Sequence, residues 1–222
     1  MRPVDAASLI LIDRGGGEPR FLMGRRHEGH VFMPGHMVFP GGRVDPSDRR
    51  MRALRALAEP CERRLIAFPG GSPGRARALA LCAIRETAEE TGLLVGETRA
   101  HEAAVPPGWD AFANHGVQPS LAGLRFIARA ITPPRFPRRF DTRFFAAEAT
   151  AIGGSAGPVA GPDAELVTLS WLSLAEAEGE NLAEITRTIL REAVRRLEAG
   201  LDEDRPVPVF SERHGRWLRS ET

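Results

Sequence analysis

Hydrophobic and polar residues alternate along this chain with two periods, which predict both strands and helices. An apolar run over residues 4–12, a Gly-rich turn over 14–19 and a second run over 21–26 predict a β-hairpin. Further strands are predicted over residues 121–130, 140–150 and 165–172. Apolar residues at helical spacing predict helices over residues 48–59, 75–91 and 182–198. The second helix should end at Gly92, a residue typical of helix C-termini.

The order of these elements predicts an α/β protein with a mixed sheet and helices packed on it. Residues 60–75 are predicted to be irregular, residues 152–162 to be a loop, and residues from 205 onward have no clear assignment. The sequence has no internal repeat and no long linker, so we expect one domain over residues 1–222.

The composition excludes several classes of protein. Charged residues make up 27% and hydrophobic residues 42% of the 222 residues, as in globular proteins. The formal net charge is only +1, so we expect no nucleic-acid partner held by bulk charge. No apolar run approaches the ~18 residues of a membrane span, so we expect no membrane partner. All 30 lysine-plus-arginine residues are arginine, which excludes a P-loop NTPase because its phosphate loop needs a lysine.

The two cysteines, Cys61 and Cys82, do not form a Cys-x-x-Cys pair. Cysteines used so sparingly are simplest to explain as reduced thiols of an intracellular protein. We therefore expect a cytoplasmic location.

Three glutamates lie close together in the second predicted helix. At about 100° per residue, Glu86, Glu89 and Glu90 lie roughly opposite a stripe containing Leu81 and Ile84, which should face the core. Spacings of three and four place the carboxylates within one helical turn. On spacing alone, an ordinary solvated face explains them. The alternative is a hard-oxygen site for Mg²⁺ or Mn²⁺.

The residues around the glutamates favour the metal site. The run Arg85-Glu-Thr-Ala-Glu-Glu-Thr-Gly-Leu93 matches Arg-Glu-U-x-Glu-Glu-x-Gly-U, the second half of the Nudix box, except that Thr87 stands at an aliphatic position. Pro40-Gly-Gly42 resembles the loop that opens the same box, and Asp48 stands six residues after Gly42, where the motif has an acid. The chain therefore resembles the Nudix hydrolases.

The two halves of the motif are unusually far apart. Thirty-six residues separate Asp48 from Arg85, so we expect an insertion at about residues 49–75. An insertion at this place, together with residues 32–42 and 139–145, resembles the Nudix subgroup akin to peroxisomal coenzyme A diphosphatases. We expect the insertion to cap the pocket or to form an interface.

The resemblance implies a Nudix-type α/β/α sandwich whose second helix carries Mg²⁺ or Mn²⁺. The metal ligands would be Glu86, Glu89, Glu90 and a backbone carbonyl at Gly41 or Gly42. Either Glu86 or Glu89 would act as the general base.

Two further residues have implied roles around the metal. Arg85 would not bind the ion but would orient the carboxylates by hydrogen bonds. Glu165, six residues before Trp171, is the candidate for an additional acidic ligand. Its alternative role is that of a solvent-facing strand residue.

Arginine side chains are the candidates for binding substrate phosphate, because guanidinium groups make bidentate contacts to it. The four candidates are Arg25, Arg26, Arg139 and Arg143. The alternative for each of them is that it forms a surface salt bridge.

The implied activity is metal-dependent cleavage of a diphosphate linkage in a nucleoside diphosphate derivative, a small molecule. Coenzyme A or acyl-coenzyme A is one candidate substrate. The coenzyme A signature of one Nudix branch is matched only in part, because Gly35 and Arg26 are kept but Val31 replaces its second arginine. The alternatives are a hydrolase of nucleoside diphosphate sugars or dinucleotides, and a ligand-binding module without catalysis. The oligomeric state stays open, a homodimer included.

Overall fold

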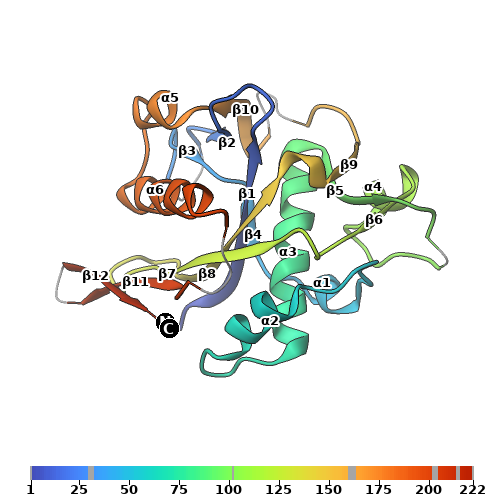
Figure 1. The fold of residues 1–222 in the computed structure, drawn as a ribbon, viewed down its shortest axis with the longest axis horizontal. Helices are drawn as coiled ribbons and strands as arrows, with labels where there is room; N and C mark the ends of the chain where they lie inside the picture. Colours follow the sequence, from blue (N-terminus) through green and yellow to red (C-terminus); the bar gives the residue numbers. More distant parts are fainter. Residues whose placement is uncertain are drawn as a thin grey trace.

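A computed structural model of the protein describes residues 2–29, 33–101, 103–159, 164–201, 205–213 and 216–221. Figure 1 shows a central sheet with helices on both faces, which is the α/β/α sandwich predicted from the sequence. No helix in the described part of the chain is long and apolar enough to cross a bilayer.

The large sheet has nine strands within the described residues, in the order β10-β2-β1-β8-β7-β11-β12, with β3 paired to β2 and β4 paired to β1. The pairs β1–β8 and β7–β11 are parallel and the others are antiparallel, so the predicted mixed sheet is confirmed. Its strands are β1 (Val4–Asp13), β2 (Arg20–Arg26), β3 (Met37–Val38), β4 (Gly41–Arg43), β7 (Arg125–Ile131), β8 (Phe140–Glu148), β10 (Leu166–Leu172), β11 (Pro208–Arg213) and β12 (Arg216–Glu221).

A second, three-stranded sheet has the order β6-β5-β9. Its strands are β5 (Leu93–Thr98), β6 (Val117–Pro119) and β9 (Ile152–Ser155). The helices are α1 (Pro46–Arg50), α2 (Glu59–Ile66), α3 (Pro73–Thr91), α4 (Asp110–Asn114), α5 (Leu174–Glu178) and α6 (Glu184–Glu198), with a 3₁₀ turn η1 (Ala149–Ala151).

Alternate residues of β1 supply two hydrophobic cores, because successive side chains of a strand point to opposite faces. Leu9 and Leu11 pack on the face covered by α3, and Ile10 and Ile12 pack on the face covered by α6. Helix α3 lies against β1 and β4 of the large sheet and against β5 of the small one. Helix α3 is therefore packed against both sheets.

The ends of α3 follow the sequence closely. Ser72 caps the N-terminus by accepting a hydrogen bond from the Arg75 N–H, and Pro73 occupies the first turn. Gly92 ends the helix with φ +74°, and a Cβ there would lie 1.9 Å from the carbonyl oxygen of Gly157. The predicted helix and its stop at Gly92 are confirmed.

The helix predicted over residues 48–59 is wrong. Only α1 is helical there, and α2 begins at Glu59 and runs through part of the stretch 60–75 that was expected to be irregular. Between the two helices, the backbone N–H of Leu54 donates to the Pro119 carbonyl at 2.7 Å. This pairing with the segment of β6 outweighs the local helical periodicity.

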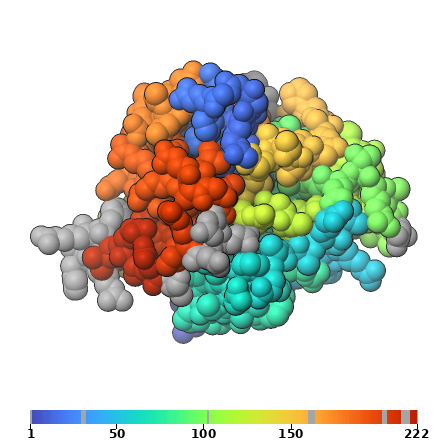
Figure 2. All heavy atoms as spheres, viewed as in Figure 1, coloured from blue at the N-terminus to red at the C-terminus, as the bar shows by residue number. Residues whose placement is uncertain are grey.

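The segment between α1 and α3 is built into the fold. Leu65 of α2 and the following Phe68 are buried in the core beneath α3, and the ring of Phe68 meets that of Phe126 edge-on. Figure 2 shows this segment, in cyan to teal, along the lower edge of the molecule. The segment therefore contributes residues to the hydrophobic core as well as to the surface.

Other predictions are corrected at the ends of elements. The loop predicted over 152–162 begins with β9, which pairs with β5. The unassigned stretch from residue 205 contains β11 and β12. The strand predicted from residue 121 begins at Arg125, after a turn closed by the Leu124 N–H donating to the Leu121 carbonyl.

Candidate active site on helix α3

The three glutamates of α3 differ in exposure. The side chain of Glu89 is 46% exposed, whereas that of Glu86 is 15% exposed and Glu90 as a whole is only 7% exposed. The alternative of an ordinary solvated face therefore does not hold for Glu90, because strand β4 packs on this side of the helix. A buried carboxylate is costly unless something compensates its charge.

Arg85 organises the carboxylates around it. Its guanidinium binds Asp48 through two hydrogen bonds, Nε to Oδ1 at 2.8 Å and an Nη to Oδ2 at 3.1 Å. Another Nη lies 2.9 Å from an oxygen of Glu86 and 2.9 Å from an oxygen of Glu89. Asp48 is fully buried, so this contact joins two parts of the chain that lie 37 residues apart.

Thr87, the departure from the motif, is accommodated inside the helix. Its side chain is fully buried, and its hydroxyl donates to the Ala83 carbonyl at 2.8 Å. The hydroxyl is thereby satisfied without a partner outside the helix.

The two glycines of β4 allow the glutamates to approach the backbone. The Gly41 N–H donates to Oε2 of Glu90 at 2.9 Å. A Cβ added at Gly42 would lie 2.5 Å from the carboxyl group of Glu86. Any side chain at Gly42 would displace Glu86, which explains why the sequence has glycine there.

The ladder between β1 and β4 distinguishes the two glycine carbonyls. Antiparallel strands alternate between residues that bond across the ladder and residues that point away from it. Gly42 pairs with Ala7, and its carbonyl also accepts from the Cys82 thiol at 3.5 Å. The Gly41 N–H points away from β1 to Glu90, and its carbonyl follows the same direction. Of the two predicted carbonyl ligands, Gly41 is therefore better placed.

Burial and neighbouring charges make these glutamates hard to ionise. Burial, opposed by the charge of Arg85 and reinforced by that of Glu89, raises the pKa of Glu86 to about 7. Burial raises the pKa of Glu90 to about 8, opposed by the hydrogen bond from Gly41 and reinforced by the charge of Glu165. The pKa of Glu89 is also raised, chiefly by burial.

The donor set suits a hard divalent cation. The Oε1 atom of Glu90 is buried and has no hydrogen-bond partner among the described residues. Over the same residues, no three metal-ligating side chains are already gathered around one point. The reason is visible in the contacts, since Arg85 holds Glu86 and Glu89 and the Gly41 N–H holds Glu90. Carboxylate oxygens in excess, one without a partner, fit Mg²⁺ or Mn²⁺.

Two predicted residues from distant segments lie beside this group. Glu165 precedes β10, and its Oε1 lies 2.9 Å from an Nη of Arg26 on β2. The negative charge of Glu165 raises the pKa of both Glu86 and Glu90, and the charge of Arg26 lowers that of Glu90. Because β10 contacts α3 and pairs with β2, the fold brings Glu165 and Arg26 next to the helix that carries the carboxylates.

The other three predicted phosphate ligands lie elsewhere. Arg25 binds Glu180 at 2.6 Å and the Gly35 carbonyl at 3.4 Å. Arg139 donates to the Thr132 carbonyl in the connection between β7 and β8.

Arg143 corrects the prediction most clearly. It is 2% exposed, and one Nη lies 2.9 Å from Asp141 and 3.2 Å from Asp5, inside the protein. A guanidinium enclosed with two carboxylates is a structural ion pair and is closed to a substrate phosphate.

Sequence reasoning missed one neighbour of the site. Gly108, in the loop before α4, has φ +85°, and a Cβ there would lie 3.4 Å from Glu89 and 3.5 Å from Arg85. This loop forms a wall beside Glu89. The Gly-Trp pair at residues 108–109 resembles an ordinary turn, so no signal in the sequence could have placed it there.

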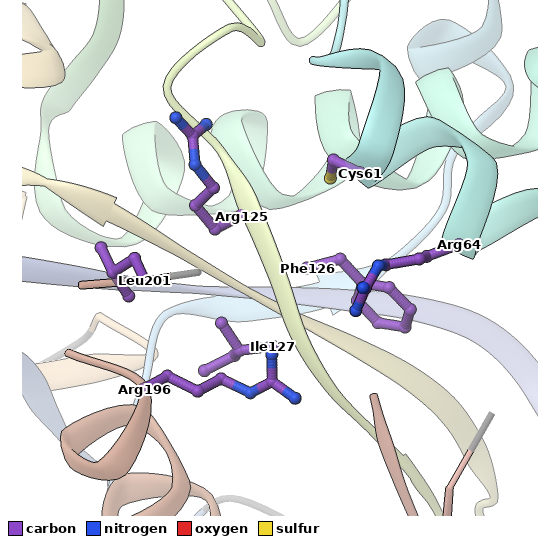
Figure 3. A pocket seen from close by; sticks show the side chains of 7 residues that line it. All are labelled: Cys61, Arg64, Arg125, Phe126, Ile127, Arg196 and Leu201. Carbon is purple, nitrogen blue, oxygen red and sulfur yellow. The ribbon is translucent and has the colours of Figure 1, made fainter. Parts of the chain in front are cut away.

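Two hollows lie away from the carboxylates. Figure 3 shows a small cleft between α2, β7 and the end of α6, with Arg64, Phe126 and Arg196 among the residues that line it. A larger pocket of about 240 Å³ is lined by residues of the inserted segment, by one residue of α3 and by one residue after β6, namely Arg52, Ala53, Ala56, Leu57, Glu62, Arg77 and Leu121. Neither hollow includes a glutamate of α3.

Solved structures with a similar fold carry the Nudix name. A Nudix hydrolase from Alicyclobacillus acidocaldarius is 29% identical, with a TM-score of 0.64 over 86% of this chain and 90% of that chain. The Nudix domain of Shewanella oneidensis NrtR, solved with ADP-ribose, is 17% identical, with a TM-score of 0.49 over 89% and 90% of the two chains. A Nudix hydrolase from Listeria monocytogenes, described as putative, is 14% identical, with a TM-score of 0.49 over 90% and 97%. No protein-family model matches the chain.

The likeness to the Alicyclobacillus protein extends over most of both chains. The chain has the Nudix fold, and this likeness supports a Nudix hydrolase enzyme.

Proposed function

We propose that this chain, a hydrolase with the Nudix fold, uses a divalent metal to cleave the diphosphate linkage of a nucleoside diphosphate derivative. The observation that carries the proposal is the excess of carboxylates at one end of α3. Over the described residues, Asp48, Glu86 and Glu89 all pair with Arg85, Glu165 pairs with Arg26, and Glu90 accepts from the Gly41 N–H. An excess of buried negative charge has no structural benefit, but it suits a cation.

Mg²⁺ or Mn²⁺ would be held by Glu86, Glu89 and Glu90, with the Gly41 carbonyl and Glu165 as further oxygen ligands. When bound, such an ion neutralises a diphosphate and lowers the pKa of a coordinated water. The remaining tasks fall to the side chains of the chain.

Arg85 positions the carboxylates through its contacts to Glu86 and Glu89, and Asp48 fixes Arg85 in turn. Glu86 and Glu89 are the two candidates for the general base that takes a proton from the attacking water. Glu89 is the more exposed of the two and stands beside the loop at Gly108.

The contact between Asp48 and Arg85 supports the interpretation of a split Nudix box. The acid of the first half binds the arginine of the second half despite the insertion between them. This arrangement is the one expected if residues 49–75 were inserted into an intact box. The insertion, the stretch 32–42 and the stretch 139–145 favour coenzyme A or acyl-coenzyme A as substrate, although residue 32 lies outside the described residues.

Both cysteines are buried, and neither forms a disulfide within the described residues. Free thiols suit a reducing compartment, so we place the reaction in the cytoplasm.

The test is a turnover screen with Mg²⁺ and with Mn²⁺, analysed by product mass. The panel contains coenzyme A, acetyl-coenzyme A, NADH, ADP-ribose and a nucleoside diphosphate sugar, with EDTA as the control. We expect phosphopantetheine and 3′,5′-ADP from coenzyme A. Cleavage of another member only would keep the diphosphatase and replace the substrate. Folded protein that binds a panel member without turning it over would instead support a ligand-binding module.

A further inference from the structure

Arg26 and Arg25 are neighbours on β2, but their surroundings differ. Arg26 is 11% exposed, and its guanidinium is paired with Glu165 at 2.9 Å. The pairing is held by the backbone, because the His27 N–H donates to the Glu165 carbonyl at 3.0 Å. Arg25 instead binds Glu180, outside the carboxylate site.

Arg26 also compensates a second carboxylate. Its charge stabilises the ionised form of Glu90, while Glu165 and Glu86 destabilise it. Glu90 has one oxygen bound to the Gly41 N–H and one oxygen without a partner among the described residues. Arg26, on β2, thus pairs with Glu165, and β2 lies beside β10, the strand that contacts α3.

We propose that Arg26 acts as the counter-cation of the metal-free site, and that a divalent metal displaces it. Metal binding would transfer Glu165 from Arg26 to the ion and free the guanidinium for a phosphate of the substrate. The inference rests on the proposed function and adds an order to it, with metal binding before substrate.

The proposed role predicts that removing the Arg26 guanidinium has opposite effects on metal binding and on substrate binding. A guanidinium competes with the metal for carboxylates, so removing it should strengthen metal binding. The same guanidinium contacts the substrate once the metal is bound, so removing it should weaken substrate binding. A purely structural salt bridge would predict loss of both affinities, and a simple substrate ligand would leave metal affinity unchanged.

The experiment is a calorimetric titration of metal-free protein with Mn²⁺. We expect Arg26→Gln to bind Mn²⁺ about three- to tenfold more tightly than wild type. Removing one solvent-screened unit charge near an ion should change the affinity for that ion by about this factor. Arg26→Lys retains the charge and should stay close to wild type. Arg25→Gln, in the neighbouring position, is the matched control and should leave Mn²⁺ affinity unchanged.

A second titration uses α,β-methylene-ADP as a diphosphate probe in saturating Mn²⁺. Arg26→Gln should bind the probe at least about tenfold more weakly, since a charge-assisted bidentate contact is lost. Circular dichroism of each variant establishes that it is folded.

A double-mutant cycle identifies Glu165 as the shared partner. If Arg26 acts by holding Glu165, the gain in Mn²⁺ affinity from Arg26→Gln should shrink in a Glu165→Gln background. Unchanged or weaker Mn²⁺ binding by folded Arg26→Gln would overturn the inference while leaving the metal site in place. Absence of Mn²⁺ binding by wild type would instead overturn the proposed function.

Discussion

Two clusters of charged side chains lie along helix α3, and they differ in how completely their carboxylates are paired with arginines. The acidic cluster, at the C-terminal half, comprises Asp48, Arg85, Glu86, Glu89 and Glu90, with Glu165 and Arg26 beside it. The balanced cluster, at the N-terminal end, comprises Asp5, Arg75, Arg129, Asp141 and Arg143. Both are largely enclosed, but only the balanced cluster pairs every carboxylate.

In the balanced cluster, each aspartate is held by a bidentate guanidinium. Asp5 accepts two bonds from Arg75 at 2.6 and 2.8 Å, and Asp141 accepts two from Arg129 at 2.7 Å. Burial alone would raise the pKa of Asp5, but the hydrogen bond and charge of Arg75 outweigh it and lower that pKa. This cluster fastens the start of α3 to the sheet.

In the acidic cluster, burial raises the pKa values of the glutamates more than the neighbouring positive groups lower them. The pKa values of Glu86 and Glu90 rise to about 7 and about 8 in spite of Arg85 and the Gly41 N–H. We interpret the paired charges as structural and the excess carboxylates as the proposed metal site. The two clusters should therefore respond in opposite ways to substitution.

The largest effect is expected on catalysis. Glu90→Gln and Glu86→Gln should each lower kcat/KM by about 10²–10³-fold, because a metal ligand contributes several kcal/mol to transition-state stabilisation. Steady-state kinetics on the substrate found in the screen measures this. Glu148→Gln, which removes a charge paired with Arg14 at the surface, is the control. Near-normal turnover by Glu90→Gln would take Glu90 out of the metal site.

A slightly smaller effect is expected on stability. Asp141→Asn should lower the free energy of unfolding by about 3 kcal/mol, because Arg129 and Arg143 lose their shared carboxylate in an enclosed position. Urea denaturation measures the change. The folded fraction should keep its Mn²⁺ affinity, since the cluster lies away from the glutamates. An unfolding free energy equal to that of wild type would show that the balanced cluster contributes little.

In the acidic cluster, a substitution that removes a charge should instead increase the free energy of unfolding. At pH 8.5 without metal, Glu90→Gln should raise the free energy of unfolding by about 1–3 kcal/mol, because a buried and poorly compensated charge is removed. The Gln side chain can still accept the Gly41 N–H. Destabilisation of the metal-free protein by Glu90→Gln would mean that this carboxylate is structural.

The stability of the metal-free protein should also depend on pH. A carboxyl group with a raised pKa in the folded chain holds its proton more tightly there than when unfolded. The metal-free protein should therefore become more stable as pH falls from about 8 toward 4.5, the window set by Glu90 and its ordinary value. Thermal unfolding across this range checks the slope. Only below the ordinary value of 3.8 should protonation of Asp5 begin to destabilise the balanced cluster. A flat or inverted slope above pH 5 would contradict the account of the acidic cluster.

The sequence predicts those parts of the molecule that follow from local periodicity. Strand β1 and helix α3 have clear patterns, and Gly92 fixes where α3 ends. The helix predicted over 48–59 fails because Leu54 pairs with a segment more than sixty residues away. Local pattern contains no information about such a contact.

In the site, as in the fold, the sequence predicts what depends on local spacing and does not predict what depends on long-range contacts. The motif around Arg85 identifies the glutamates, because their spacing on one helix is local information. Residue type alone cannot separate Arg26 from Arg143, since both are arginines on strands. Only the fold shows that Arg143 is enclosed between aspartates and that Arg26 meets Glu165. Which carbonyl faces the site, Gly41 or Gly42, likewise depends on the register of β4 with β1.

The most direct test is the binding of Mn²⁺ to metal-free protein, followed by electron paramagnetic resonance of the free ion. Wild type and Asp141→Asn should both bind Mn²⁺ saturably, and Glu86→Gln and Glu90→Gln should bind it at least about tenfold more weakly. Equal binding by wild type and both glutamine variants, or no binding by folded wild type, would contradict the assignment of the acidic cluster as the metal site.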